Sequence, residues 1–155
     1  MDTPQPNPRF QPGLDSGGLP TGYPFRPDWE ITPRQTAAVH RAKLTETGQA
    51  AAVLQEGEPD NSGPLLLDCR RADEWALARI DGAVLIPMQE LPSRVDDVLD
   101  AAGSHDRQII VYCHHGARSM RVTAALRGYG FTNVRSMAGG IDLWSADIDP
   151  RVPRY

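Results

Sequence analysis

A loop that begins with a cysteine offers the clearest chemistry in this sequence. Cys113 directly follows the apolar run Ile109–Tyr112, and Gly116, Arg118 and a predicted helix start come soon after it. In open α/β sheets, ligands bind beyond the carboxyl ends of the strands, where this cysteine would lie. Loop amides and a helix N-terminus favour negative charge there, whether a thiolate or a bound oxyanion. An ordinary thiol has a pKa near about 8.5, so this setting would raise the thiolate fraction.

The same cysteine is also compatible with a purely structural role, because free cysteine is often a small buried hydrophobe. The glycine and the arginine beside the helix start favour the nucleophile, since Gly116 lets the backbone turn tightly. His114 and His115 are interpreted as polar loop residues that face a substrate. A catalytic base or a metal pair is the less favoured alternative, because adjacent loop residues usually point in different directions. No second His/Cys cluster completes a metal site.

Predicted strands and predicted helices alternate along the chain, and together they must position this loop. Continuous apolar runs predict buried strands at residues 65–68, 83–87 and 109–112, and a last short strand is expected at residues 133–136. Helical spacing and end signals predict helices at residues 33–47, 72–79, 91–103, 122–129 and 141–145, with a possible helical stretch to 54 and a loop at 57–64. Thr32 and Gln35 form a capping box for the first helix. This alternation predicts an α/β fold, with a central, mostly parallel sheet and helices on both faces.

Composition excludes several classes of function. The chain has 155 residues, which suits one domain, and 16 Lys+Arg against 20 Asp+Glu give a net charge of −4. A basic footprint for nucleic acid or for an anionic membrane is therefore absent. No apolar run approaches the roughly 18–20 residues that span a membrane, and the N-terminus does not resemble a secretory signal. With only two cysteines, Cys69 and Cys113, we expect a reduced, cytoplasmic protein.

Prolines divide the chain into a tail and a domain. Eight of the 14 prolines fall at or before Pro33, in a stretch that also holds several glycines. We therefore expect residues 1–28 to be a disordered or loosely draped tail, because such a segment buries little apolar area. The predicted domain covers residues 29–149. Residues 150–155 should form an extended tail that buries Val152 or Tyr155 against the domain.

Four motifs in order resemble the single-domain rhodaneses, a family of sulfurtransferases. The first two are Leu67-Asp68-Cys69-Arg70 with Glu74-Trp75, and Ile80-Asp81-Gly82-Ala83 with Ile86-Pro87. The other two are Cys113-x-x-Gly116-x-Arg118-Ser119, and Gly139-Gly140-Ile141 with Trp144. Together they extend over about residues 29–149. Each motif alone is weak, and their order makes the resemblance specific.

The resemblance implies a central parallel sheet and transfer of sulfane sulfur without a cofactor or a metal. Cys113 would attack a sulfur donor such as thiosulfate, become a persulfide and pass the sulfur to a thiol or to cyanide. A protein donor or acceptor is also possible. Substrate binding would fall to the loop residues His114, His115, Gly116, Ala117, Arg118 and Ser119. Asp68 and Arg70 would be structural supports.

The sequence departs from the family pattern at two positions, and two other functions are also compatible with it. Cys69 replaces the usual valine and is interpreted as a buried hydrophobe, with a resolving thiol as the alternative. Arg79 replaces a frequent histidine, and Glu74 is interpreted as a solvated helix charge. Related folds with a Cys-x5-Arg loop are phosphatases or arsenate reductases, but here four residues separate Cys113 from Arg118. A non-catalytic rhodanese-like binding module is the other alternative, although such modules commonly lack the cysteine.

Overall fold

A five-stranded parallel sheet forms the centre of the protein in a computed structural model, which describes residues 13–40 and 63–155. The sheet order is β1-β5-β4-β2-β3, and every neighbouring pair is parallel. The strands are β1 (Glu30–Ile31), β2 (Leu65–Asp68), β3 (Val84–Leu85), β4 (Ile109–Tyr112) and β5 (Val134–Met137). The helices are α2 (Ala72–Leu77), the 3-10 helix η1 (Met88–Ser93), α3 (Val95–Ala102), α4 (Ala117–Gly128) and α5 (Gly140–Asp147). Residues 33–40 are also helical.

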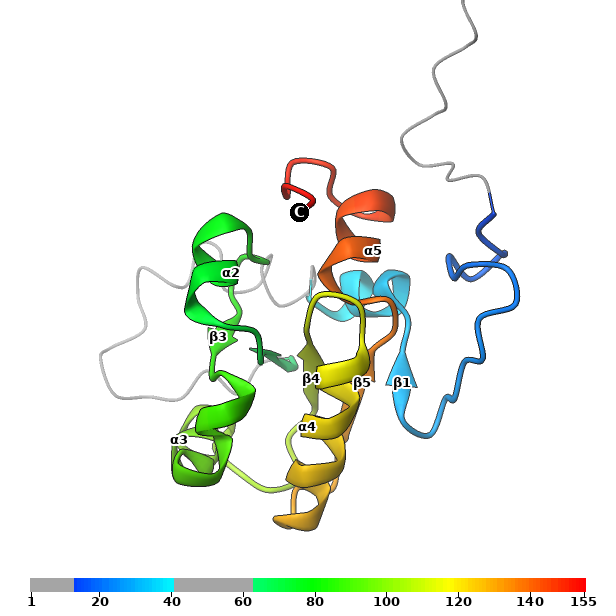
Figure 1. Cartoon of the computed structure of the whole chain (residues 1–155). Helices are drawn as coiled ribbons and strands as arrows, with labels where there is room; N and C mark the ends of the chain where they lie inside the picture. Colours follow the sequence, from blue (N-terminus) through cyan, green and yellow to red (C-terminus); the bar gives the residue numbers. More distant parts are fainter. Residues whose placement is uncertain (1–12, 41–62) are drawn as a thin grey trace, which may run out of the picture.

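The two faces of the sheet are covered by different helices, which confirms the predicted fold class. On one face, Val111 of β4 packs in a core with Val122 and Leu126 of α4. On the other face, Ile110 packs in a core with Trp144 of α5. Figure 1 shows α4 running in front of β4 and β5. All four residues of β2 and of β4 are buried, because both strands are apolar on both faces.

The sequence patterns locate most elements, but not all of their ends. The strand predicted at residues 83–87 is paired only at Val84–Leu85. The helix predicted at residues 91–103 is instead η1 followed by α3. Pro92, which lies inside η1, cannot donate a backbone hydrogen bond, so the α-helix begins only after it. Strand β1 has two residues and was not predicted, since so short a strand has no readable period.

The capping box at the first helix is confirmed. The Gln35 amide donates to Thr32 Oγ1 at 3.0 Å, and the Thr32 amide donates to Gln35 Oε1 at 3.0 Å. The predicted continuation of this helix to residue 47 lies outside the described residues. The same holds for the stretch to 54, most of the loop at 57–64, and residues 1–12 of the tail.

Residues 13–28 differ from the loosely draped tail that proline content suggested. Leu19 is only 4% exposed and packs with Ala138 and Leu143. Tyr23 packs against the same cluster, and its hydroxyl donates to the Glu30 carboxylate. A few apolar side chains therefore hold this segment against the domain, which a count of prolines and glycines does not reveal.

The C-terminal segment folds back over the domain. Val152 is buried in the core of the face that Trp144 covers, and its amide donates to the Asp149 carbonyl within a turn. Tyr155 is 40% exposed. Within residues 13–40 and 63–155, no helix is long and apolar enough to cross a membrane.

Candidate active site

Cys113 lies at the carboxyl end of β4 and its sulfur accepts hydrogen bonds from the loop that follows. The Gly116 amide donates to Sγ at 3.1 Å, and the Ser119 amide donates to it at 3.3 Å. Gly116 precedes the first residue of α4 and has φ +116°, a conformation that side chains rarely adopt. The sequence thus folds the loop into a concave set of N–H groups around one sulfur atom.

A pair of buried hydroxyl groups lies beside the same sulfur. Ser119 Oγ is 3.4 Å from Cys113 Sγ and 2.7 Å from Ser136 Oγ on β5. Either serine can donate to the other, and when Ser136 donates, the single Ser119 proton can go to the Gly116 carbonyl at 3.1 Å or to the thiolate. Sequence analysis missed Ser136. A serine two residues after Val134, on the buried side of the same strand, was the available signal, because a buried hydroxyl needs a partner.

These donors make Cys113 acidic. A hydrogen bond from the Cys69 thiol is the largest cause, and the Ser119 hydroxyl with the Ser119 and Gly116 amides add to it. Together they outweigh burial, which acts in the opposite direction, and lower the pKa of Cys113 to about 5. Cys113 is therefore a thiolate at neutral pH, although it is only 1% exposed.

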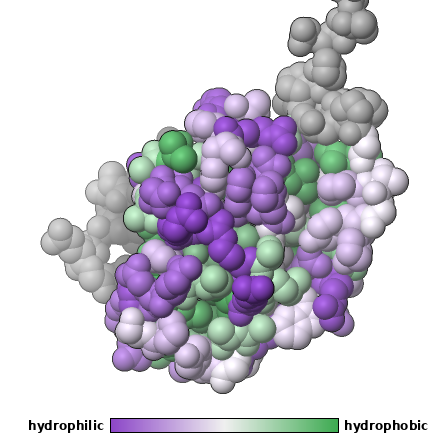
Figure 2. Space-filling view, in the orientation of Figure 1, coloured by the Kyte–Doolittle hydropathy of each residue, from purple (hydrophilic) through white to green (hydrophobic). Residues whose placement is uncertain are grey.

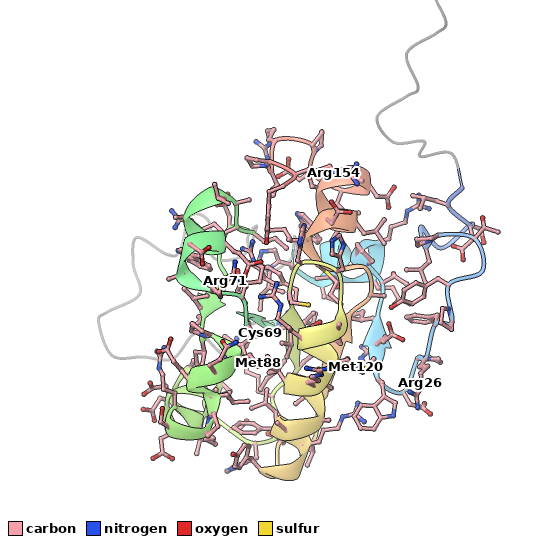
Figure 3. All side chains as sticks on the ribbon, in the orientation of Figure 1. Arg26, Cys69, Arg71, Met88, Met120 and Arg154 are labelled. Atoms are coloured by element: carbon pink, nitrogen blue, oxygen red, sulfur yellow. The ribbon has the colours of Figure 1, made fainter. Side chains whose placement is uncertain are left out.

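The second cysteine is the lateral neighbour of the first. Asp68 pairs with Tyr112 in the register of β2 and β4, and Cys69 and Cys113 are the next residues of the two strands. The Cys69 amide donates to the Tyr112 carbonyl at 3.1 Å, which continues the pairing. Both sulfurs belong to the core on the α4 face. Figure 3 labels Cys69 near the start of α4. The anionic neighbour and burial raise the pKa of the Cys69 thiol.

Asp68 and Arg70 form an internal ion pair, as a structural role requires. Both side chains are fully buried, and Arg70 Nη2 lies 2.6 Å from Asp68 Oδ2. Asp68 Oδ1 also accepts a hydrogen bond from the Arg70 amide at 2.9 Å. Arg70 donates further to the carbonyls of Glu74 and Ala78. The pair thereby fixes the turn between β2 and α2, because every donor of a buried guanidinium needs an acceptor.

Glu74 is not the solvated charge that its helical position suggested. It is 4% exposed and accepts two hydrogen bonds from Arg118, at 2.7 and 2.8 Å. Arg118 chiefly causes the pKa of Glu74 to fall to about 2. Arg118 is thus held by a bidentate pair from the side of α2. Tyr155 joins this pair to the neighbouring one, because its hydroxyl donates to Glu74 and accepts from Arg70.

The two loop histidines lie side by side rather than pointing apart. Their ring centroids are 3.9 Å apart, and the His114 ring also stacks on Tyr155 at 4.1 Å. Burial, followed by the charge of His115, lowers the pKa of His114, so its ring is neutral at neutral pH. His115 is exposed, with Nδ1 3.9 Å from Asp142 Oδ2. Among the described residues, no three His, Cys, Asp or Glu side chains gather as metal ligands.

The start of α5 supports the loop from the opposite side. The Ile141 amide donates to the Cys113 carbonyl at 2.9 Å, and the Asp142 amide donates to the His114 carbonyl at 3.1 Å. A Cβ atom on Gly140 would lie 2.3 Å from the His114 oxygen, so only glycine fits there. The paired glycines at the start of α5, Gly139 and Gly140, therefore let two backbones meet at the site.

The surface around the loop is polar and hollowed on one side. Figure 2 shows hydrophilic residues over the region of α2 and α5. A hollow of about 380 Å³ is lined by His115, Tyr23, Asp142 and Arg154, among others. Ala117 is exposed at the start of α4, whereas Ser119 is buried beneath it.

A model of the rhodanese-like domain matches residues 47–147 of this chain. The chain belongs to the rhodanese-like domain family. Solved structures of this fold superpose on it. The thiosulfate sulfurtransferase of Pseudomonas aeruginosa has a TM-score of 0.58 and 23% identity, over 77% of this chain and 19% of that one. The rhodanese-related protein of Thermoplasma volcanium has a TM-score of 0.55 and 23% identity, over 82% of this chain and 99% of that one. They support the rhodanese fold.

Curated relatives share part of this rhodanese-like chain. A sulfurtransferase of Allochromatium vinosum is 34% identical over 92 residues, which are 59% of this chain and 81% of that protein. The probable adenylyltransferase/sulfurtransferase MoeZ of Mycobacterium tuberculosis is 36% identical over 90 residues, which are 58% of this chain and 22% of MoeZ. MOCS3-1 of Zea mays, an adenylyltransferase and sulfurtransferase, is 34% identical over 66% of this chain and 22% of its own length. This chain spans only about a fifth of those two proteins.

Proposed function

We propose that this rhodanese-like chain is a sulfurtransferase that carries sulfane sulfur as a persulfide on Cys113. The observation that carries the proposal is the convergence of the Gly116 and Ser119 amides on a thiolate at the end of β4. The names of the relatives support the same class of reaction. Cys113 is the nucleophile, and the loop from His114 to Ser119 binds the sulfur that is transferred.

In the first step, the Cys113 thiolate attacks the outer sulfur of a donor such as thiosulfate. A new S–S bond forms to Sγ, the S–S bond of the donor breaks, and sulfite leaves with its electron pair. A pKa near 5 keeps the nucleophile charged without a separate base at neutral pH. The loop amides stabilise the negative charge that the transferred sulfur retains.

In the second step, an acceptor thiolate or cyanide attacks the outer sulfur of the persulfide. The Cys113 thiolate leaves, and its low pKa makes it a good leaving group. Donor and acceptor are small molecules or the persulfide and thiol of another protein. The exposed His115 and Ala117 border the side from which they approach. Asp68 and Arg70 have a structural role, because their ion pair holds the turn that leads to Glu74.

The geometry of Arg118 favours sulfur transfer over phosphate or arsenate chemistry. An oxyanion enzyme needs a guanidinium that is free to hold a tetrahedral anion. Here both Arg118 Nη atoms are bound to the Glu74 carboxylate. The spacing of four residues after Cys113 also makes a narrower loop, sized for one sulfur atom.

The test is to incubate the full chain with thiosulfate and to measure intact mass. We expect the mass of one sulfur atom on Cys113, removable by cyanide, and thiosulfate:cyanide turnover. Cys113→Ser should show neither, with a native circular dichroism spectrum as the control for folding. Full turnover in that variant, or hydrolysis of aryl phosphates faster than sulfur transfer, would refute the proposal.

A further inference from the structure

In the sulfur-transfer scheme, Cys69 lowers the pKa of Cys113 but forms no bond to the transferred sulfur. The family pattern places valine at this position, and the described protein has no other sulfhydryl group besides Cys113. Its side chain is 1% exposed, so a dissolved thiol cannot reach it directly. The neighbouring sulfur of Cys113 is therefore the group with which the Cys69 thiol can react.

We propose that Cys69 is a resolving thiol, which attacks Sγ of the Cys113 persulfide, releases the carried sulfur as hydrosulfide and leaves a Cys69–Cys113 disulfide. This inference rests on the proposed function, since it requires the persulfide. It adds a second outcome to the reaction, in which sulfur is reduced at the site instead of being passed to an acceptor.

The strand register carries the proposal. Asp68 and Tyr112 are direct partners, and Cys69 and Cys113 continue the two strands on the same face of the sheet. Neighbouring strands are about 4.8 Å apart. Disulfides bridge Cα atoms that are roughly 4.4–6.8 Å apart, so the backbone need not move far to close this one.

The surroundings of Cys113 also direct the attack. In the sheet, β4 lies between β2 and β5. Cys69 therefore flanks Cys113 on one side, whereas Ser136 and its partner Ser119 lie toward the other side. The Gly116 and Ser119 amides donate to Sγ from the loop after β4. The resolving thiol thus approaches Sγ from a side that the loop donors leave open.

The step balances without an external oxidant. A bond forms between the Cys69 sulfur and Sγ, and the bond from Sγ to the outer sulfur breaks. The outer sulfur leaves with the bonding electron pair and takes the proton of the Cys69 thiol. It is reduced by two electrons while the two cysteines are oxidised to the disulfide. A dithiol reductant then restores both thiols and is itself oxidised to a disulfide.

The experiment uses the full reduced chain, without added thiol and under argon. One equivalent of thiosulfate loads the protein, small molecules are removed at once, and released sulfide is measured with time. We expect close to one sulfide per loaded protein and a Cys69–Cys113 linked peptide in a non-reducing digest. Dithiothreitol should return both thiols and permit a second round of release.

Variants separate this inference from the proposed function. Cys69→Val should take up one sulfur on Cys113 and hold it, with sulfide release at least about tenfold slower than in the wild type. Leu67→Val, on the same strand and face, keeps both thiols and serves as the matched control, which should release sulfide like the wild type. Loading of Cys69→Val is carried to completion, because loss of the Cys69 hydrogen bond raises the pKa of Cys113 and slows this step. If the wild type takes up no sulfur, the proposed function itself fails.

Three results would overturn the resolving role. They are a wild-type persulfide that persists without sulfide release, sulfur recovered on Cys69, and release from Cys69→Val as fast as from the wild type. The first two are measured on the wild-type chain, so they decide the question even if the valine variant does not fold.

Discussion

The carboxyl ends of β2 and β4 are each followed by a cysteine, in register and on one face of the sheet. The pKa values of the two thiols are nevertheless shifted in opposite directions. At the end of β4, a hydrogen bond from the Cys69 thiol, followed by the Ser119 hydroxyl and the loop amides, lowers the pKa of Cys113 to about 5. At the end of β2, Cys69 donates to that anion, and its pKa is raised. Position at a strand end therefore does not activate a cysteine. The difference comes from the Cys69 hydrogen bond together with the loop after β4, which turns its N–H groups back toward the Cys113 sulfur.

The sharpest test of this comparison is the pH dependence of alkylation in the reduced chain. Because the thiolate is the reactive form, modification of Cys113 by iodoacetamide should rise through a midpoint near pH 5 and stay level above it. Cys69 should react on the order of a thousandfold more slowly at neutral pH, since it is both protonated and buried. Peptide mapping at each pH assigns the label. Equal labelling of both cysteines would contradict the predicted difference in acidity between Cys113 and Cys69.

The next largest effect should come from Gly140→Ala, because the added methyl group would displace the loop after β4. Its Cβ would lie 2.3 Å from the His114 oxygen, so the loop must shift. Donors moved by roughly 1 Å lose much of their effect on the anion, and we expect sulfur transfer to fall about 100-fold. Gly128→Ala is the matched control, because nothing lies within 4 Å of the corresponding Cβ. Activity that falls equally in both variants would show that loop geometry is not the cause.

Glu74→Gln tests the β2 side, where the carboxylate holds Arg118. We expect a loss of about 1.5–3 kcal/mol in the free energy of unfolding at pH 7, typical of hydrogen bonds to charged groups. The pKa of Glu74 is lowered to about 2, so its contribution is complete above the ordinary value near 4.5 and lost as the pH falls toward 2. The difference between wild type and variant in urea denaturation should shrink over that range. A difference that is independent of pH would contradict the charged pair.

The smallest effect concerns the hydroxyl pair beside Cys113. Ser136→Ala removes the group that can orient the Ser119 proton toward the sulfur. One hydrogen bond is worth about 0.5–1.5 kcal/mol, so activity should fall roughly 2–10-fold and the alkylation midpoint should move to higher pH. Thr123→Val, which removes another buried hydroxyl from α4, is the control and should leave that midpoint unchanged. An unshifted midpoint in Ser136→Ala would assign Ser136 to packing alone.

Local patterns in the sequence determined much of the fold and the centre of the site. Residues 65–68 and 109–112 are strands because continuous apolar side chains cover both faces of a buried sheet. Thr32 and Gln35 cap a helix through contacts within four residues. Gly116 and the start of α4 come directly after Cys113, so the thiolate's amide donors were readable from spacing. These inferences succeed because the groups involved are close in the chain.

Only the tertiary structure decided which distant groups meet at that site. Cys69 became the neighbour of Cys113 through the register of two strands, which no local spacing encodes. Ser136 was brought to Ser119, and Glu74 to Arg118, by the packing of separate elements. Pairing across a sheet depends on how the whole chain closes its core. The sequence could therefore single out Cys113 and its amide donors, but not the Cys69 thiol that contributes most to its low pKa.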